Sequence, residues 1–272
     1  MTQRTSVGEH LRDWRQRRRM TQLDLALEAD ISPKHLSFVE TGRSRPSRQM
    51  VLLLAEHLDV PLRERNAILV AGGYAPVYPE RALDAPDLVA VRRAVDLVLK
   101  GHEPFPALVV DRHWNLVAAN AAAATFLVDD PELIAPPVNV VRMSLHPRGL
   151  APRIVNFTEW RTHILDRLRR QIDATADPVL EALHAEVKAY PAPPAAVGVA
   201  HGIDYGGVAV PLKLQTDAGV LAMIGTMTVF GTPVDVTVSE LALETFFPAD
   251  EFTLGVLQKL AEQRRMGQTE AA

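Results

Sequence analysis

The sequence has no cysteine, and it has no apolar run long enough to cross a membrane. Without cysteine the chain has no disulfide, no thiol nucleophile and no Cys-ligated zinc, which fits a reducing compartment. The longest stretch free of Asp, Glu, Lys and Arg covers residues 218–234, and its 17 residues include three Gly, three Thr and one Pro. A spanning helix needs about 20 predominantly apolar residues. The first residues also lack the apolar core of a signal peptide. We therefore expect a cytoplasmic protein that does not insert into membranes.

The sequence also lacks the short motifs of common catalytic and phosphate-binding sites. Neither Gly-x-Ser-x-Gly nor Gly-x-x-x-x-Gly-Lys occurs. Two His–carboxylate pairs have helical spacing, Glu159 with His163 and Glu181 with His184. A metal site on helices needs several such pairs, so we expect both on solvated helix faces. The sequence therefore predicts no catalytic residue, no metal and no required cofactor, and an enzymatic function has little support.

Charge divides the chain into two parts. Its 272 residues are enough for about two domains. Residues 1–75 carry a net charge of +3, whereas residues 76–272 carry −7. The basic side chains of the first part gather in two clusters, at 12–19 and 32–48. A small basic unit on an acidic chain indicates that one end binds a polyanion.

Five short helices are expected in residues 1–75. Val7, Leu11 and Trp14 recur at i, i+4 and i+7, on one face of a first helix. The later helices begin at capping residues or prolines, which are Thr21, Ser32, Ser47 and Pro61. Glycines end the third and fifth helices, at Gly42 and at Gly72–Gly73. The spacing therefore predicts an all-α domain.

Residues 20–47 hold the segment on which the functional prediction depends. Two helices of about two turns, joined by a tight turn, need flanking helices to bury their apolar faces. The second of them presents Lys34, Ser37 and Phe38 away from its apolar face. Basic and polar groups at the start of a protruding helix can reach base edges and phosphates in a major groove.

Residues 6–62 resemble the phage-repressor-like helix-turn-helix family, often called the XRE family. The resemblance is carried by Thr21-Gln22, Leu25-Ala26, Ile31-Ser32, Leu36-Ser37, Val39-Glu40-x-Gly42 and Arg45-Pro46-Ser47. It implies a domain that binds duplex DNA, with Gln22 on phosphate and Pro33, Lys34 and Phe38 facing bases. The full set of expected DNA contacts is Gln22, Ser32, Pro33, Lys34, Ser37, Phe38, Arg43 and Arg45.

The resemblance also implies an ion pair between Arg15 and Glu40. One departure concerns the turn, where the family usually has Gly and this chain has Asp30. Asp tolerates the left-handed backbone region better than most residues, so we expect the turn to be kept. The alternative is a helical bundle that binds only proteins, and the basic exposed face argues against it.

The remaining chain mixes strands and helices and predicts an α+β domain with an antiparallel sheet. Residues 74–87 contain three prolines, so residues 76–104 are expected to form a linker and a connecting helix. Two hairpins are predicted within residues 105–265, from 107–111 with 114–119 and from 207–216 with 220–230. The second is expected to turn at Asp217-Ala218-Gly219. Helices are predicted at 120–127, 158–174, 177–189 and 250–263, with fraying from Arg264 onward.

Several of these segments resemble the MmyB-like ligand-binding domain, which often follows this type of helix-turn-helix. They are residues 106–120, 145–147, the helix of Trp160, 228–235 and 243–250. The resemblance covers about 105–262 and implies a PAS-like fold, in which helices cover one face of a curved antiparallel sheet. It also implies a small apolar ligand, with a fatty acid as the favoured candidate.

Aromatic and methionine side chains are the candidates for lining a ligand cavity. They are Trp114, Phe126, Phe157, Trp160, Met223, Met227 and Phe230. For any single one of them, a place in a solid core is the commoner outcome. An acyl carboxylate needs a cation, and His146 and Arg148 are the candidates, although solvation at the surface accounts for both as well.

Together these features predict a transcription regulator that binds double-stranded DNA as a homodimer. One short recognition helix contacts few base pairs, so two-fold pairing through the C-terminal domain is expected. A small apolar effector in that domain would shift the population of states that differ in the spacing of the two DNA-binding units. The alternative is a regulator whose second domain only dimerises or docks a partner protein.

Overall fold

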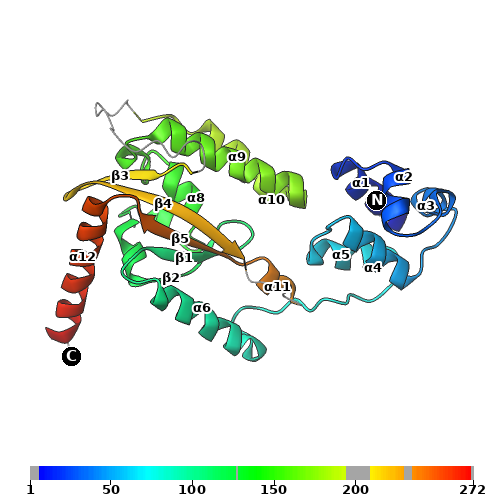
Figure 1. The fold of residues 1–272 in the computed structure, drawn as a ribbon, viewed down its shortest axis with the longest axis horizontal. Coiled ribbons are helices and arrows are strands. Elements are labelled where there is room, and N and C mark those ends of the chain that lie inside the picture. Colours follow the sequence, from blue (N-terminus) through cyan, green and yellow to red (C-terminus); the bar gives the residue numbers. More distant parts are fainter. Residues whose placement is uncertain (1–5, 127, 194–208, 230–234, 271–272) are drawn as a thin grey trace. The chain divides into compact units, whose positions relative to one another are not determined.

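The computed structural model describes residues 6–126, 128–193, 209–229 and 235–270. The chain divides into a helical unit, made mainly of the residues up to Ala82, and a larger mixed unit. The helical unit contains α1 (Val7–Arg17), α2 (Gln22–Glu28), α3 (Pro33–Glu40), α4 (Arg48–His57) and α5 (Leu62–Ala71) (Figure 1). The later helices are η1 (Pro86–Leu88), α6 (Val89–Gly101), η2 (Ala121–Phe126), α7 (Pro131–Ile134), α8 (Val140–Leu145), η3 (Ala151–Arg153), α9 (Phe157–Thr175), α10 (Pro178–Ala189), α11 (Val236–Ser239) and α12 (Glu251–Glu270). The strands are β1 (Ala107–Val110), β2 (Leu116–Ala119), β3 (Leu212–Thr216), β4 (Gly219–Val229) and β5 (Ala242–Pro248).

The five predicted helices of the helical unit are confirmed, with the caps that the sequence indicates. The Thr21 hydroxyl accepts the Asp24 N–H at 3.1 Å, while the Asp24 carboxylate accepts the Thr21 N–H at 2.8 Å. Ser32 and Ser47 cap α3 and α4 through their hydroxyls, and Pro33 takes the first position of α3. These contacts satisfy N–H groups that have no partner inside the helix.

Two positions with positive φ set the path around α3. Asp30 has φ of 51° and Gly42 has φ of 72°. Asp30 therefore adopts the left-handed conformation that the turn requires, as predicted. The helices around it share one core, whose largest fully buried members are Leu11, Leu25, Leu36, Leu54, Leu58, Ile68 and Leu69.

The start of the linker is attached to α5. The Asn66 side-chain oxygen accepts the N–H groups of Val77 and Tyr78 at 3.0 and 3.1 Å, and its amide donates to the Tyr78 carbonyl at 2.7 Å. One asparagine therefore satisfies three backbone groups of a segment without regular secondary structure. The helical unit therefore continues past α5 into the linker, as far as Ala82.

The mixed unit is built on one five-stranded sheet with the order β2-β1-β5-β4-β3, in which every neighbouring pair is antiparallel. Both predicted hairpins are present, although residues 207–208 and Phe230 of the second lie outside the described residues. Thr216 pairs with Gly219, so the turn itself consists of Asp217 and Ala218. β5 was not predicted as a strand, and it joins the two hairpins into one sheet.

Helices cover both faces of this sheet, with α9 and α10 on one side and α6 on the other (Figure 1). Alternate residues of β1 separate the two cores: Leu108 faces the α9 side, while Ala107 and Val109 pack with α6. The MmyB-like resemblance implied helices over one face, and α6 adds cover on the second. The predicted fold class, a five-helix domain followed by an α+β domain with an antiparallel sheet, is confirmed.

Two helix predictions need correction. Residues 121–126 form a 3₁₀-helix, although Asn120 caps it as expected by accepting the Ala123 N–H at 3.1 Å. α12 continues to Glu270 instead of ending at Gln263. Within the described residues, no helix combines the length and apolar character needed to span a membrane.

Candidate DNA-binding surface and ligand cavity

The start of α3 presents a basic and aromatic surface. Pro33, Lys34 and Arg43 are exposed, and Ser37 and Phe38 are half-buried. The Lys34 ammonium lies 5.7 Å from the centre of the Phe38 ring, and the Arg43 guanidinium lies 5.9 Å from it. Both cations are within range of attraction to the ring. The structure thus brings these five predicted DNA contacts together on one exposed surface.

Two further predicted DNA contacts, Ser32 and Arg45, are also exposed but have structural bonds of their own. The Ser32 hydroxyl accepts the His35 N–H at 3.1 Å. Arg45 donates to the Gly72 carbonyl at 3.0 Å, and its guanidinium lies 5.8 Å from the centre of the Tyr74 ring. Arg45 therefore ties the loop after α3 to the end of α5.

A buried ion pair links α1 to α3. The Arg15 Nε and Nη2 atoms donate to the two carboxylate oxygens of Glu40 at 2.6 and 2.8 Å. The Glu40 side chain is 0% exposed and that of Arg15 is 10% exposed. The bonds to Glu40 raise the pKa of Arg15, against the opposing effect of burial. This bidentate geometry fits the ion pair that the resemblance implied.

The eighth predicted DNA contact, Gln22, belongs to the same network. Its side-chain amide donates to Glu40 Oε2 at 2.8 Å, and Arg15 Nη1 donates to the Met20 carbonyl at 2.8 Å. Glu40 thus orients a side chain at the start of α2 while it holds α1. Loss of this carboxylate would release both partners.

An apolar cavity of about 50 Å³ lies between α9 and the sheet. Of the predicted ligand contacts, Trp114, Phe126 and Trp160 line it, and all three are buried. Most of the other lining side chains are aliphatic or aromatic, namely Leu108, Val140, Val141, Met143, Leu150, Ile164, Leu212 and Phe246. Only Ser144 and Glu244 add polar groups to the lining.

The other predicted ligand contacts lie elsewhere. Phe157 and Met223 are buried in the core of the mixed unit but do not line the cavity. Met227 also does not line it and is 42% exposed. Phe230 lies outside the described residues.

The two predicted head-group cations, His146 and Arg148, also lie away from the cavity lining. Arg148 is exposed and pairs with Asp130 at 3.3 Å and with Glu132. The His146 Nδ1 accepts the Arg148 N–H at 3.1 Å, and its ring packs edge-on against Tyr190. Both side chains therefore make structural contacts of their own in and around the 145–149 loop.

Sequence reasoning missed an ion pair beside the cavity. Arg167 of α9 donates to Glu244 of β5 at 2.8 Å, with side-chain exposures of 17% and 8%. The guanidinium lies 4.4 Å from the centre of the Trp114 ring. A signal was present, because Trp160, Ile164 and Arg167 recur at i, i+4 and i+7 on the inward face of α9.

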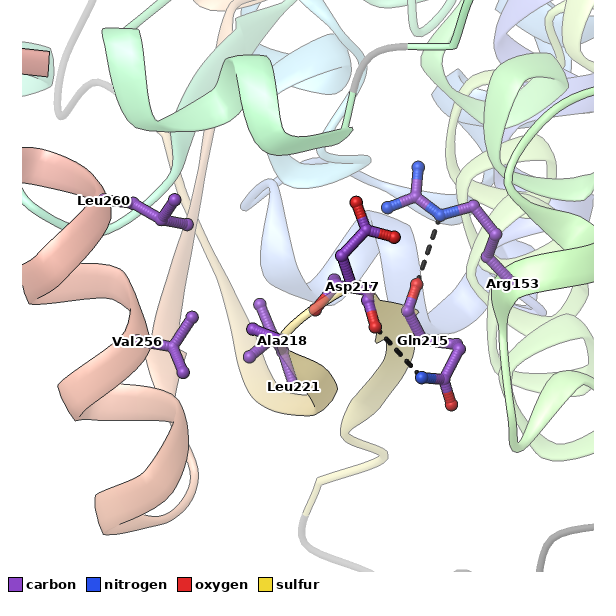
Figure 2. Close-up of a pocket in the computed structure, with 8 residues that line it drawn as sticks. Arg153, Gln215, Asp217, Ala218, Leu221, Val256 and Leu260 are labelled. Carbon is purple, nitrogen blue, oxygen red and sulfur yellow. Dashed lines mark hydrogen bonds between the residues drawn. The ribbon is translucent and has the colours of Figure 1, made fainter. Parts of the chain in front are cut away.

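A second and larger hollow, of about 720 Å³, lies at the surface between the β3–β4 turn and α12. Figure 2 shows Val256 and Leu260 of α12 on one side and Gln215 and Asp217 on the other. Arg153 donates to the Gln215 carbonyl at 3.2 Å along the same wall. Polar side chains make up half of the lining of this groove, so it matches an apolar ligand less well than the cavity beside α9 does.

Two known families match the chain over these units. The helix-turn-helix model matches residues 11–65, and the model of the MmyB-like transcription regulator ligand binding domain matches residues 91–260. The chain belongs to the MmyB-like family. It is therefore a DNA-binding transcription regulator with a ligand-binding domain. Both families are those of regulators and not of enzymes. Comparison with curated proteins gives no match.

Proposed function

We propose that the effector of this MmyB-like regulator is a small, mainly apolar molecule, with a fatty acid as the favoured class. The observation that supports the proposal is the cavity between α9 and the sheet, with its largely aliphatic and aromatic lining. A dry apolar cavity gains free energy when an apolar group fills it.

The size of the cavity bears on how such a ligand would act. Its volume of about 50 Å³ compares with about 30 Å³ for one water molecule in the liquid and roughly 300–1,000 Å³ for small-molecule pockets. The cavity must therefore expand to admit an acyl chain. A ligand that binds only the expanded state shifts the population toward that state. Phe126 of η2 and three residues of α8, Val140, Val141 and Met143, line the cavity from short helices outside the sheet.

Titration of the full chain with saturated fatty acids of increasing length tests this proposal. Each buried CH₂ contributes about 0.8 kcal/mol, so affinity should rise roughly fourfold per carbon until the expanded cavity is full. Val140→Phe, at the lining, should weaken binding. Val179→Phe is the matched control, because Val179 is 49% exposed and should tolerate the change. Absence of binding at every length would favour the alternative, a domain that only dimerises or docks a partner.

The second part of the proposal is that the regulator acts as a homodimer held by its C-terminal domain. α3 has only eight residues, so one copy contacts few base pairs. Helix-turn-helix proteins usually bind as dimers to two half-sites about 34 Å apart. An exposed apolar row on α6, which includes Leu97 at 64% and Val98 at 43% exposure, supports contact with a second copy. Apolar patches of this kind mark association surfaces.

Selection of binding sites from a random duplex pool tests the DNA-binding surface and the dimer together. We expect two half-sites one helical turn apart, and a single half-site would contradict the dimer.

Arg43→Ala should weaken binding to all sequences alike and lower the slope of log affinity against log salt concentration by about 0.9. Lys34→Ala should also relax base preference at one position, by about 1–3 kcal/mol. Lys259→Ala, an exposed change on α12, is the control. A loss for Lys34→Ala that is equal on all sequences would refute base reading by Lys34.

A further inference from the structure

We propose that Arg167 binds the carboxylate of the ligand whose apolar part occupies the adjoining cavity. This inference rests on the proposed function and assigns its head-group site. The polar end of the ligand would then lie between α9 and the central strand β5, away from the 145–149 loop that holds His146 and Arg148.

The first observation is a buried donor without a partner. The Nη2 atom of Arg167 is buried and makes no hydrogen bond within the described part of the chain. Nη1 of the same guanidinium donates to Glu244 at 2.8 Å. An unsatisfied buried donor of a charged group is costly, so native structures rarely keep one without a reason. An acceptor oxygen on a ligand would satisfy it.

The second observation is where this guanidinium lies. Its two close neighbours, Glu244 and Trp114, both line the cavity. Glu244 lies on β5 directly opposite Leu108 of β1, another lining residue. Arg167 is not itself a lining residue, and its guanidinium adjoins the apolar space through these two side chains.

The guanidinium is also held in place before any ligand arrives. Trp114 has φ of 68°, a conformation that bulky residues seldom adopt, and its indole N–H donates to Gln171 at 2.8 Å. The centre of the Trp114 ring lies 4.4 Å from the Arg167 guanidinium, which is a cation–π contact. The guanidinium also donates to the Glu244 carboxylate. A cation fixed in this way loses little entropy when it binds an anion.

The surrounding charge favours a carboxylate over a neutral acceptor. His163, one turn before Arg167, stacks on Trp160 with ring centres 5.6 Å apart. Its pKa is lowered, first by burial and then by Arg167 and Arg170, whose effects exceed those of Asp166 and Glu159. At His163 these two arginines therefore act more strongly than the two neighbouring carboxylates. Charge-assisted bonds from Arg to carboxylate are about twice as strong as neutral ones.

The test uses the full chain with dodecanoic acid and methyl dodecanoate as probes, because the two share one chain and differ in head-group charge. Arg167→Gln should weaken binding of the acid roughly ten- to hundredfold and change binding of the ester less than about twofold. Arg142→Gln is the matched control, since Arg142 forms a bidentate pair with Glu186 at the surface of the same unit. It should change neither affinity.

Glu244→Gln gives an independent test with the opposite sign. The variant keeps Arg167 and removes the carboxylate that competes for it, so the acid should bind several-fold more tightly. This arm remains informative if Arg167→Gln does not fold. Equal loss of acid and ester in folded Arg167→Gln, or weaker acid binding in Glu244→Gln, would overturn the assignment while leaving an apolar effector in place. Failure of the wild-type chain to bind either probe would instead overturn the proposed function, and the assignment with it.

Discussion

Replacing Glu40 with alanine is expected to destabilise the helical unit by about 3–5 kcal/mol, because it leaves a charged Arg15 side chain largely buried without its partner. The change also removes the acceptor of Gln22. A domain of this size unfolds with only about 4–12 kcal/mol, so the loss is a large fraction of the total. Thermal unfolding of a 1–82 fragment should show a midpoint lower by at least about 12 °C.

The control for this change is Glu80→Ala in the same fragment. Glu80 pairs with Arg63 at 2.6 Å, which equals the shortest distance in the Arg15–Glu40 pair, but its side chain is 55% exposed. Exposed pairs contribute about 0–1 kcal/mol, so the midpoint should move by a few degrees at most. Glu40→Gln should fall between the two, because an amide oxygen can keep one bond from Arg15. Equal midpoints for Glu40→Ala and Glu80→Ala would show that burial adds nothing to the pair.

Gly8→Ala is expected to cost about 1–3 kcal/mol or more, although alanine usually stabilises a helix. A Cβ at this position would lie 2.2 Å from the Val39 carbonyl oxygen and 2.9 Å from that of Glu40. Both obstacles are backbone atoms at the end of α3, so α1 must move away from the recognition helix. Thermal unfolding of the 1–82 fragment measures the cost.

Gly255→Ala provides the opposite expectation for the same substitution. Gly255 lies inside α12 and has no atom within 4 Å of an added Cβ. The change should therefore stabilise the mixed unit by about 0.5–1 kcal/mol, measured by urea unfolding of the full chain. If Gly8→Ala also stabilised its unit, α1 and α3 would not be in the close contact described above.

The helices of the helical unit were predictable because the residues that start, end and orient each helix lie within or next to that helix in the sequence. Caps, prolines and glycines delimit each helix, and the spacing of Val7, Leu11 and Trp14 identifies a buried face. The exposed start of α3 followed from the same pattern. The close approach of Gly8 to α3 was not predictable, because it depends on backbone atoms more than 30 positions away.

The mixed unit was harder because its decisive contacts are distant in sequence. β5 is covered on both faces, so its buried run lacks the alternation that indicates a half-exposed strand. Its one charged residue, Glu244, predicts an exposed position, because a charged side chain is seldom buried without a partner. That partner, Arg167, lies 77 positions earlier in the sequence. The sequence points to His146 and Arg148, which lie in a loop, whereas Arg167 next to the cavity lies on the same face of α9 as Trp160. Only the folded sheet brings these groups together.

The most direct test of the account is the affinity of the full chain for its selected DNA site, measured at fixed salt with and without saturating dodecanoic acid. If the ligand-binding domain controls the DNA-binding unit, the fatty acid should change that affinity, typically by about 5–150-fold. Linkage then requires the DNA to change the affinity for the fatty acid by the same factor. A fatty acid that binds the chain but leaves DNA affinity unchanged would contradict the proposal that this domain is a sensor.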